Sequence, residues 1–134
     1  MNHQYRSVEY WNKILELDPK NQVILTRAGD AYRNTGDYDT ATEYYQKALN
    51  IEFDLYAVLG LALISKGQGK FEEAISSLSR LIQADPKNYR LYIDLADCHI
   101  KLGQKQKAID ALQDFQKLGI RSQAVAEMLE KLLA

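Results

Sequence analysis

The chain contains little cysteine, proline or histidine. Its 134 residues include one cysteine, two prolines and two histidines. The single cysteine, Cys98, excludes an internal disulfide framework and is typical of a protein in a reducing compartment. We therefore expect a cytoplasmic location.

Neither a large excess of charge nor a long apolar run is present. Lys and Arg number 17 and Asp and Glu number 18, which gives a formal net charge of -1. This balance offers no general attraction to phosphate backbones. The longest apolar run, 56–64, is far shorter than the roughly 20 residues that a membrane-spanning helix needs. We expect neither a nucleic-acid partner nor membrane insertion.

Residue combinations typical of catalysis or metal binding are also missing. His3 and His99 are isolated, and neighbours on a helix point about 100° apart, so Cys98 and His99 cannot jointly hold a metal unaided. The run Gly-Gln-Gly-Lys at 67–70 lacks the ending and the preceding strand of a phosphate-binding loop. We predict no catalytic residue, no metal and no cofactor, and we interpret Cys98 and His99 as a buried structural pair.

What the chain does contain is a repeated pattern of small residues. Gly36, Gly69 and Gly103 lie 33 and then 34 residues apart, and an alanine follows each glycine five residues later. These alanines are Ala41, Ala74 and Ala108. A period of about 34 residues predicts stacked helical hairpins, each too small to bury its own apolar face.

Apolar residues recur at helical spacing along almost the whole sequence, and alternation of period two is absent, which predicts an all-α chain. The glycines and prolines place the breaks, with Asn21 and Asn88 as candidate caps after the repeated Asp-Pro-Lys. The predicted helices span 4–17, 22–34, 38–50, 53–66, 70–84, 89–102, 105–118 and 122–133. Connections this short make neighbouring helices antiparallel.

Within each predicted hairpin, one face of the first helix should pack against the second helix. The facing sets are Leu25, Ala28, Gly29 and Tyr32 with Ala41, Tyr45 and Ala48; Tyr56, Leu59, Gly60 and Leu63 with Ala74, Leu78 and Leu81; and Tyr92, Leu95, Ala96 and His99 with Ala108, Leu112 and Phe115. Large and small residues alternate in the same slots, so the helices can approach closely.

This pattern resembles the tetratricopeptide repeat, in which a large aromatic, Leu-Gly and Tyr are followed in the second helix by Ala, an aromatic and a closing Pro. The resemblance implies a right-handed superhelical solenoid of antiparallel helix hairpins, an α-α superhelix, with about three and a half repeats and a C-terminal capping helix. It divides a single domain, 1–134, into a half repeat at 4–19, repeats at 22–52, 53–88 and 89–121, and the capping helix at 122–134.

The last predicted helix carries an apolar stripe, and Gly119 and Ser122 can end the preceding helix and cap this one. Such a helix resembles the cap that closes a repeat array, so we expect the array to end there.

The first predicted helix has apolar residues on more than one side, while its hairpin partner would precede Met1. Three explanations are open: the partner has been cut away, the helix packs on another chain, or it folds onto the second unit of its own chain. Tyr5, Tyr10 and Trp11 are the candidate residues for self-association, which would give a homodimer.

In the family that the chain resembles, the outer stripe of each first helix lines a concave groove. The corresponding residues here are Arg27, Asp30, Arg33, Val58, Leu61, Ile64, Arg90, Ile93, Asp94, Asp97, Ile100 and Lys101. The aliphatic members would form the groove floor. Four charged members would select polarity at its edges: Arg27, Arg33, Asp94 and Asp97. The alternative is that this stripe is ordinary repeat core or is covered by the first helix.

The function predicted from these features is a non-catalytic module that binds a peptide or helix of another protein in this groove. A structural or self-associating role through the first helix is the alternative. The acids on the stripe argue against the lysine and asparagine clamp with which one repeat subclass holds chaperone tails.

Overall fold

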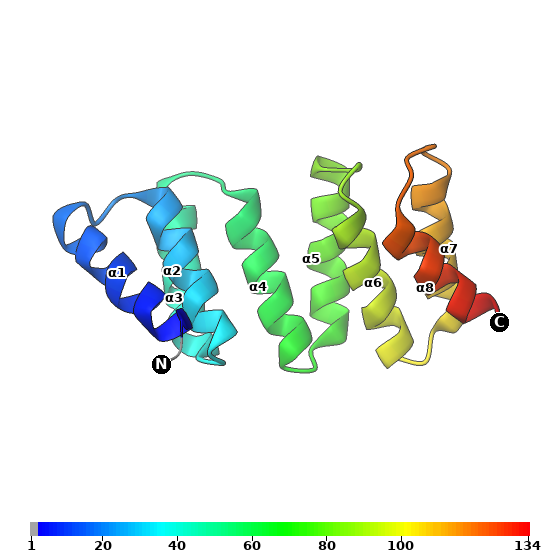
Figure 1. Cartoon of the computed structure of the whole chain (residues 1–134), viewed down its shortest axis with the longest axis horizontal. Helices are drawn as coiled ribbons and strands as arrows, with labels where there is room; N and C mark the ends of the chain where they lie inside the picture. Colours follow the sequence, from blue (N-terminus) through cyan, green and yellow to red (C-terminus); the bar gives the residue numbers. More distant parts are fainter. Residues whose placement is uncertain (1–2) are drawn as a thin grey trace. The chain divides into compact units, whose positions relative to one another are not determined.

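The computed structural model describes the backbone of residues 3–134 and the side chains of residues 9–134, and within this range the chain is entirely helical (Figure 1). The eight helices are α1 (His3–Leu17), α2 (Gln22–Asn34), α3 (Tyr38–Ile51), α4 (Leu55–Gly67), α5 (Phe71–Ala84), α6 (Tyr89–Lys101), α7 (Lys105–Gln116) and α8 (Gln123–Leu133). The prediction of an all-α chain is confirmed, and every predicted helix is present.

Two helix ends differ from the prediction by two residues. Helix α4 begins at Leu55, because the Asp54 carboxylate accepts the backbone N–H of Tyr56 at 2.9 Å and so caps the helix. Phe53 therefore lies outside the helix. Helix α7 ends at Gln116, because the backbone turns tightly at 117–119 and Gly119 adopts a left-handed φ of 76°.

The repeated glycines and alanines each have one structural role. Gly36, Gly69 and Gly103 have φ values of 86°, 78° and 74° in the turns that follow α2, α4 and α6. Residues with a side chain rarely adopt this conformation, so the turn selects glycine. The repeated alanines, Ala41, Ala74 and Ala108, are completely buried near the starts of α3, α5 and α7. The 34-residue pattern thus records one turn conformation and one buried alanine position, each used three times.

The predicted N-terminal caps are confirmed. The side-chain oxygen of Asn21 accepts the N–H of Ile24 at 3.2 Å, and that of Asn88 accepts the N–H of Arg90 at 3.2 Å. The Ser122 hydroxyl accepts the N–H of Val125 at 3.2 Å, which caps α8. Each cap satisfies a backbone donor that has no partner within its own helix.

The chain forms two compact units, Met1–Ile64 and Ser65–Ala134, each with its own core. In the first unit, Tyr45 of α3 is completely buried and lies against Gly29 of α2 and Gly60 of α4. A Cβ atom added at Gly29 would come within 2.6 Å of the Tyr45 ring, and one at Gly60 would overlap it. The two glycines therefore make the space that the tyrosine ring fills.

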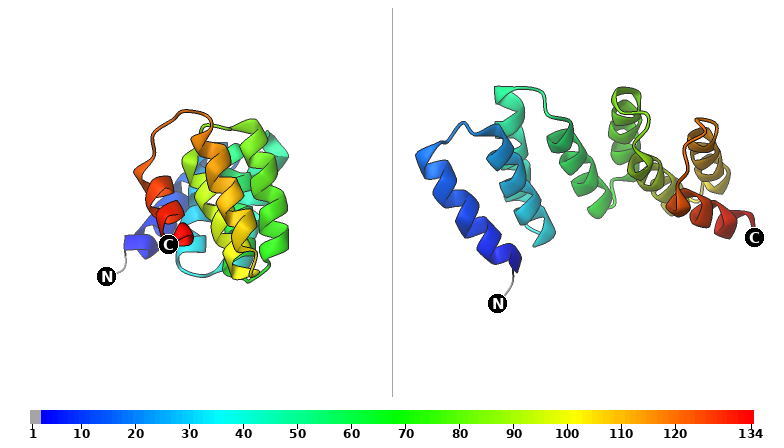
Figure 2. Two further views of the ribbon diagram at one scale, coloured as in Figure 1. Left: turned by 90° about the vertical axis from the view of Figure 1, so that its right-hand side faces the viewer. Right: turned by 45° about the horizontal axis from the view of Figure 1, so that its top comes forward.

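In the second unit, α6 and α7 pack as a pair, and α8 contacts both of them (Figures 1 and 2). The rings of Tyr92 and Phe115 lie 5.1 Å apart at the centre of this core. Val125 and Leu129 of α8 are buried on the same core. Helix α8 therefore covers apolar surface of the pair before it, as the sequence predicted for a cap.

The prediction for the inner face of α4 is wrong at Tyr56, which is 70% exposed. The buried residues of this helix are Ala57, Gly60, Ala62 and Ile64, of which the prediction named Gly60. This helix is apolar almost all round, so the spacing of its apolar residues does not reveal which face turns inward.

Helix α1 packs on α2 within the first unit of its own chain. The Asn12 side chain donates to the Tyr32 hydroxyl at 3.3 Å and accepts from the Tyr44 hydroxyl at 2.9 Å. Leu15 packs on the core of the first unit. Other side chains of α1 stay uncovered, among them Leu17 and Tyr10.

Candidate functional site

Two predicted groove residues of the first unit hold the buried Tyr45 hydroxyl. Tyr45 donates to the Asp30 carboxylate at 2.5 Å and accepts from Arg33 Nε at 3.1 Å. Arg33 and Asp30 also form an ion pair at 3.5 Å. Asp30 and Arg33 therefore satisfy a buried polar group, whatever else they contact.

The electrostatics of this cluster keep it in one protonation state. Burial, reinforced by the hydrogen bond to Asp30, raises the pKa of Tyr45 far above its usual range. Burial alone would lower the pKa of Arg33, but its contacts with Tyr45 and Asp30 outweigh this and raise it. The hydroxyl stays neutral and the guanidinium stays charged at every physiological pH.

The aliphatic residues predicted for the groove floor of the first unit are buried to different degrees. Ile64 belongs to the core, and Leu61 packs against the same core while partly buried. Val58 is half-buried. Of these three side chains, Val58 and Leu61 keep accessible surface.

An open groove of about 830 Å³ lies in the first unit between α2 and the start of α4. Three of its lining side chains are apolar and largely exposed: Val23 (60%), Phe53 (69%) and Tyr56 (70%). Its other lining residues are Gln22, Thr26, Arg27, Asp30, Asp54 and Leu55. We call this the α2–α4 groove. Arg27 and Asp30 of this groove were predicted site residues. Phe53 and Tyr56 also line it, although the sequence analysis did not assign them to a site.

The polar side chains of the α2–α4 groove are ordered by contacts within the first unit. The Thr26 hydroxyl donates to the Asp54 carboxylate at 2.6 Å. The guanidinium carbon of Arg27 lies 5.9 Å from the centre of the Trp11 ring, within the range of a cation–π interaction. The groove therefore has a fixed polar edge beside an exposed apolar surface.

In the second unit, Lys66 lies between two of the predicted groove acids. Its ammonium is 3.1 Å from Asp94 and 2.8 Å from Asp97. Burial would lower the pKa of Lys66, but its hydrogen bonds to Asp97 and Asp94 raise it instead. Sequence reasoning missed Lys66, because it is the last residue of the predicted helix 53–66 and was not assigned to the groove stripe.

The remaining predicted groove residues of the second unit lie on α6. Ile93 and Ile100 pack against the core and are partly buried. Arg90 and Lys101 are exposed, and the Arg90 guanidinium lies 5.9 Å from the centre of the Tyr89 ring. On α6, therefore, Asp94 and Asp97 form ion pairs, whereas Arg90 and Lys101 face solvent.

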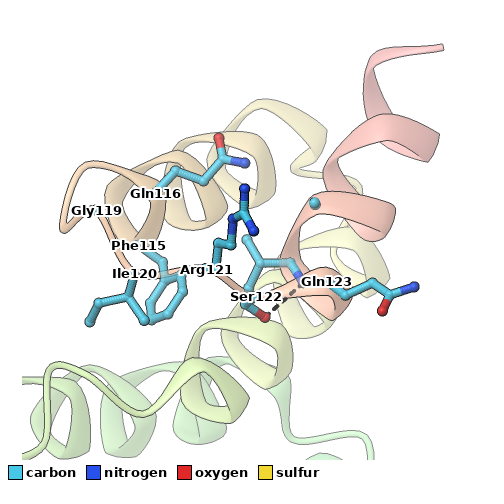
Figure 3. A pocket seen from close by; sticks show the side chains of 9 residues that line it. Phe115, Gln116, Gly119, Ile120, Arg121, Ser122 and Gln123 are labelled. Atoms are coloured by element: carbon cyan, nitrogen blue, oxygen red, sulfur yellow. Dashed lines mark hydrogen bonds between the residues drawn. The ribbon is translucent and has the colours of Figure 1, made fainter.

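A second cavity, of about 510 Å³, lies at the connection between α7 and α8. Figure 3 shows Phe115 and Ile120 side by side at its base, while Arg121 extends toward Gln116. Its walls come from the cap and the loop that leads to it, and Ile120 packs on the core of the second unit. No predicted site residue lies in this cavity.

Cys98 is completely buried, and burial raises the pKa of its thiol. His99 is half-buried, and its Nδ1 lies 2.8 Å from the Gln104 side-chain oxygen. Among the residues whose side chains are described, no three His, Cys, Asp or Glu side chains are grouped so that they could hold a metal ion. No helix in the described range has both the length and the apolar character needed to cross a membrane.

The residues predicted for self-association lie on α1. Tyr10 is 57% exposed, and its ring meets that of the half-buried Trp11 edge to face at 4.7 Å. Tyr5 lies outside the residues whose side chains the structure describes.

Comparisons with known proteins identify the repeat. Two family models described as "Tetratricopeptide repeat" match this chain, one over residues 24–55 and the other over residues 66–118. MamA 41-end from Desulfovibrio magneticus RS-1, a solved structure, superposes with a TM-score of 0.79 at 20% identity, over 96% of this chain and 73% of that chain. At this identity the likeness shows the fold alone, which is a helical-repeat solenoid.

Two curated relatives are much longer than the match. Superkiller protein 3 of Schizosaccharomyces pombe is 24% identical over 101 residues, which are 75% of this chain and 7% of that protein. Aspartyl/asparaginyl beta-hydroxylase of Mus musculus is 28% identical over 110 residues, which are 79% of this chain and 15% of that protein. The chain therefore spans only a small part of the length of these relatives. From the matched repeats, the recurrent turns and the helix pairs, we conclude that the chain belongs to the tetratricopeptide repeat family.

Proposed function

We propose that this chain is a non-catalytic module that binds a peptide or helix of another protein at the α2–α4 groove. Tetratricopeptide repeats form scaffolds for protein–protein interaction, and the proposal assigns that role to a particular surface of this chain. The observation that carries it is the exposure of Val23, Phe53 and Tyr56 around one groove. Exposed apolar side chains gathered around a concavity are typical of interaction sites.

The α6 stripe of the second unit is the second surface proposed for this role. Arg90 and Lys101 are its exposed charges, while Asp94 and Asp97 are paired with Lys66. The proposed module has no catalytic role, although the relative from Mus musculus is named as a hydroxylase. A cytoplasmic location is also proposed, and it rests on the single cysteine.

The proposal is tested by site-specific photo-crosslinking in the organism of origin. Tyr56 is replaced by benzoylphenylalanine, and the same replacement at the exposed Leu133 of α8 is the control. We expect discrete adducts with other proteins at position 56 that are absent at position 133. Failure to trap any protein at position 56, with the variant folded by circular dichroism, would contradict the proposal.

Self-association through α1 is the second candidate function. Leu17 is 90% exposed and Tyr10 is 57% exposed, although α1 already packs on α2. Sedimentation equilibrium of the chain and of the Tyr10→Ser/Leu17→Ser variant tests this candidate. A dimer that dissociates in the variant would support it, and a monomer at all concentrations would exclude it.

A further inference from the structure

The charged side chains that line the α2–α4 groove differ in whether they already have a partner in the first unit. Asp54 accepts a hydrogen bond from the Thr26 hydroxyl and another from the Tyr56 backbone N–H, and the second of these caps α4. Asp30 accepts from the Tyr45 hydroxyl and pairs with Arg33. Both lining carboxylates therefore already hold donors from the first unit.

Arg27 differs from these acids. Among the residues whose side chains are described, no carboxylate lies within ion-pair distance of its guanidinium. Its contact with Trp11 orients the group without neutralising its charge. Arg27 is exposed and lines the groove. The positive charge at this edge is therefore available to a ligand.

The apolar part of the groove complements this charge. Val23 lies one turn before Arg27 on α2, and Phe53 and Tyr56 lie on the opposite wall. Helix α2 also begins at the groove, so the positive end of its dipole adds to the field of Arg27. Glu52 precedes Phe53 in the sequence but does not line the groove.

We infer that the α2–α4 groove selects an acidic segment of a partner protein, in which an Asp or Glu carboxylate pairs with Arg27 and an adjacent aliphatic or aromatic side chain covers Val23, Phe53 and Tyr56. The guanidinium can bind a carboxylate through two parallel hydrogen bonds. This inference rests on the proposed function and adds the chemistry of the partner. A single arginine beside an apolar surface differs from the clamp of lysines and asparagines considered above.

Selection from a random peptide library displayed on phage, with the full chain as bait, tests the inference. Wild-type chain should enrich peptides that carry Asp or Glu within two positions of Leu, Ile, Phe or Trp. The Arg27→Glu variant should exchange this acidic preference for Lys or Arg, while keeping the apolar preference. Arg80→Glu, at an exposed arginine on α5, is the matched control and should leave the selected peptides unchanged.

A second pair of variants locates the binding surface. Tyr56→Ser should weaken binding of a selected, fluorescein-labelled peptide at least tenfold by fluorescence anisotropy, because Tyr56 is part of the proposed contact. Leu133→Ser removes another exposed apolar side chain, on α8, and should have no effect. Circular dichroism of each variant confirms that the helices are retained.

The outcomes separate this inference from the proposed function. Neutral or basic selected peptides, or acidic peptides whose preference survives Arg27→Glu, would overturn the inference and leave the binding function intact. Acidic peptides that bind Tyr56→Ser as tightly as wild type would overturn it as well. If no peptide is enriched and position 56 also traps no protein in cells, both fail.

Discussion

At the scale of single residues, the arrangement around Tyr45 is the most constrained part of the first unit. Its ring fills the space left by Gly29 and Gly60, and its hydroxyl is held by Asp30 and Arg33. The position combines tight packing with a satisfied buried polar group. Substitutions that disturb either the ring packing or the hydroxyl contacts should therefore change the free energy of unfolding measurably.

Gly60→Ala should destabilise the first unit. An alanine is intrinsically better than glycine in a helix by about 1 kcal/mol, but its Cβ would overlap the Tyr45 ring, and overpacking of this kind typically costs about 1–3 kcal/mol. Urea unfolding monitored by circular dichroism measures the net change. Gly67→Ala, at an exposed glycine of the same helix, is the control and should be neutral or stabilising.

A double-variant cycle with Tyr45→Leu tests the cause. The loss caused by Gly60→Ala should be smaller in the Tyr45→Leu background, since the smaller side chain leaves room for the methyl group. Equal losses in the two backgrounds would show that overlap with Tyr45 is not the reason.

Tyr45→Phe should lower the free energy of unfolding by about 1 kcal/mol at pH 7, because a buried hydrogen-bonded hydroxyl is lost. The pKa of Tyr45 is higher in the folded chain than in the unfolded chain. Its contribution is therefore complete below about pH 10 and declines as the pH rises above that value. The difference between wild type and variant, measured by urea unfolding, should stay constant up to about pH 10 and shrink as the pH rises above it. A constant difference would contradict this assignment.

At the scale of helices, sequence reasoning succeeded where a residue acts through local geometry. The break at Gly36 and the caps at Asn21, Asn88 and Ser122 depend on a few neighbouring atoms, and all were predicted; the left-handed conformation of Gly36 is the physical basis of that break. Their positions then fix the lengths of the helices between them.

Sequence reasoning failed where contacts with distant residues decide which of several equally apolar helix faces is buried. Helix α4 is apolar on nearly every side, so the exposure of Tyr56 could not be derived from spacing. The groove wall at Phe53 had one available signal: residues 51–54 lack the Asp-Pro found at 18–19 and 85–86. The pairing of Lys66 with Asp94 and Asp97 had none, since it joins residues 28 and 31 positions apart. The limits of the repeats within the chain stay a prediction.

Asn21→Ala should destabilise α2 by about 1 kcal/mol, whereas Asn21→Gly should cost only a few tenths. The alanine removes the side-chain acceptor and disfavours the extended conformation of the cap, while glycine tolerates that conformation and leaves the N–H accessible to water. Thermal unfolding followed at 222 nm compares the two variants. If both variants melt at the same temperature as the wild type, the cap contributes little to stability.

At the scale of the whole molecule, two cores form in a chain with almost no net charge. The chain also represents a short part of the two longer relatives described above, so their complete activities do not transfer to it. The exposed surface and the net charge are therefore the properties from which association of this chain with other molecules can be predicted.

The sequence isoelectric point of about 6.1 predicts a solubility minimum near pH 6. Electrostatic repulsion between molecules is weakest there, and exposed apolar side chains such as Phe53 and Leu17 then promote association. Light scattering between pH 5 and pH 8.5 should pass through a maximum near pH 6. A maximum at pH 8 would contradict this explanation, and the sedimentation test of α1 is best performed away from pH 6 for the same reason.

The close approach of Tyr45 to Gly29 and Gly60 has an evolutionary consequence. A lineage that acquires a larger residue at either glycine first meets a steric penalty, unless position 45 has already become smaller. Substitutions at the three sites should therefore arise in a fixed historical order, with the aromatic ring lost before a methyl group is gained. Reconstructed ancestors would preserve that order as a record of how this part of the repeat was assembled.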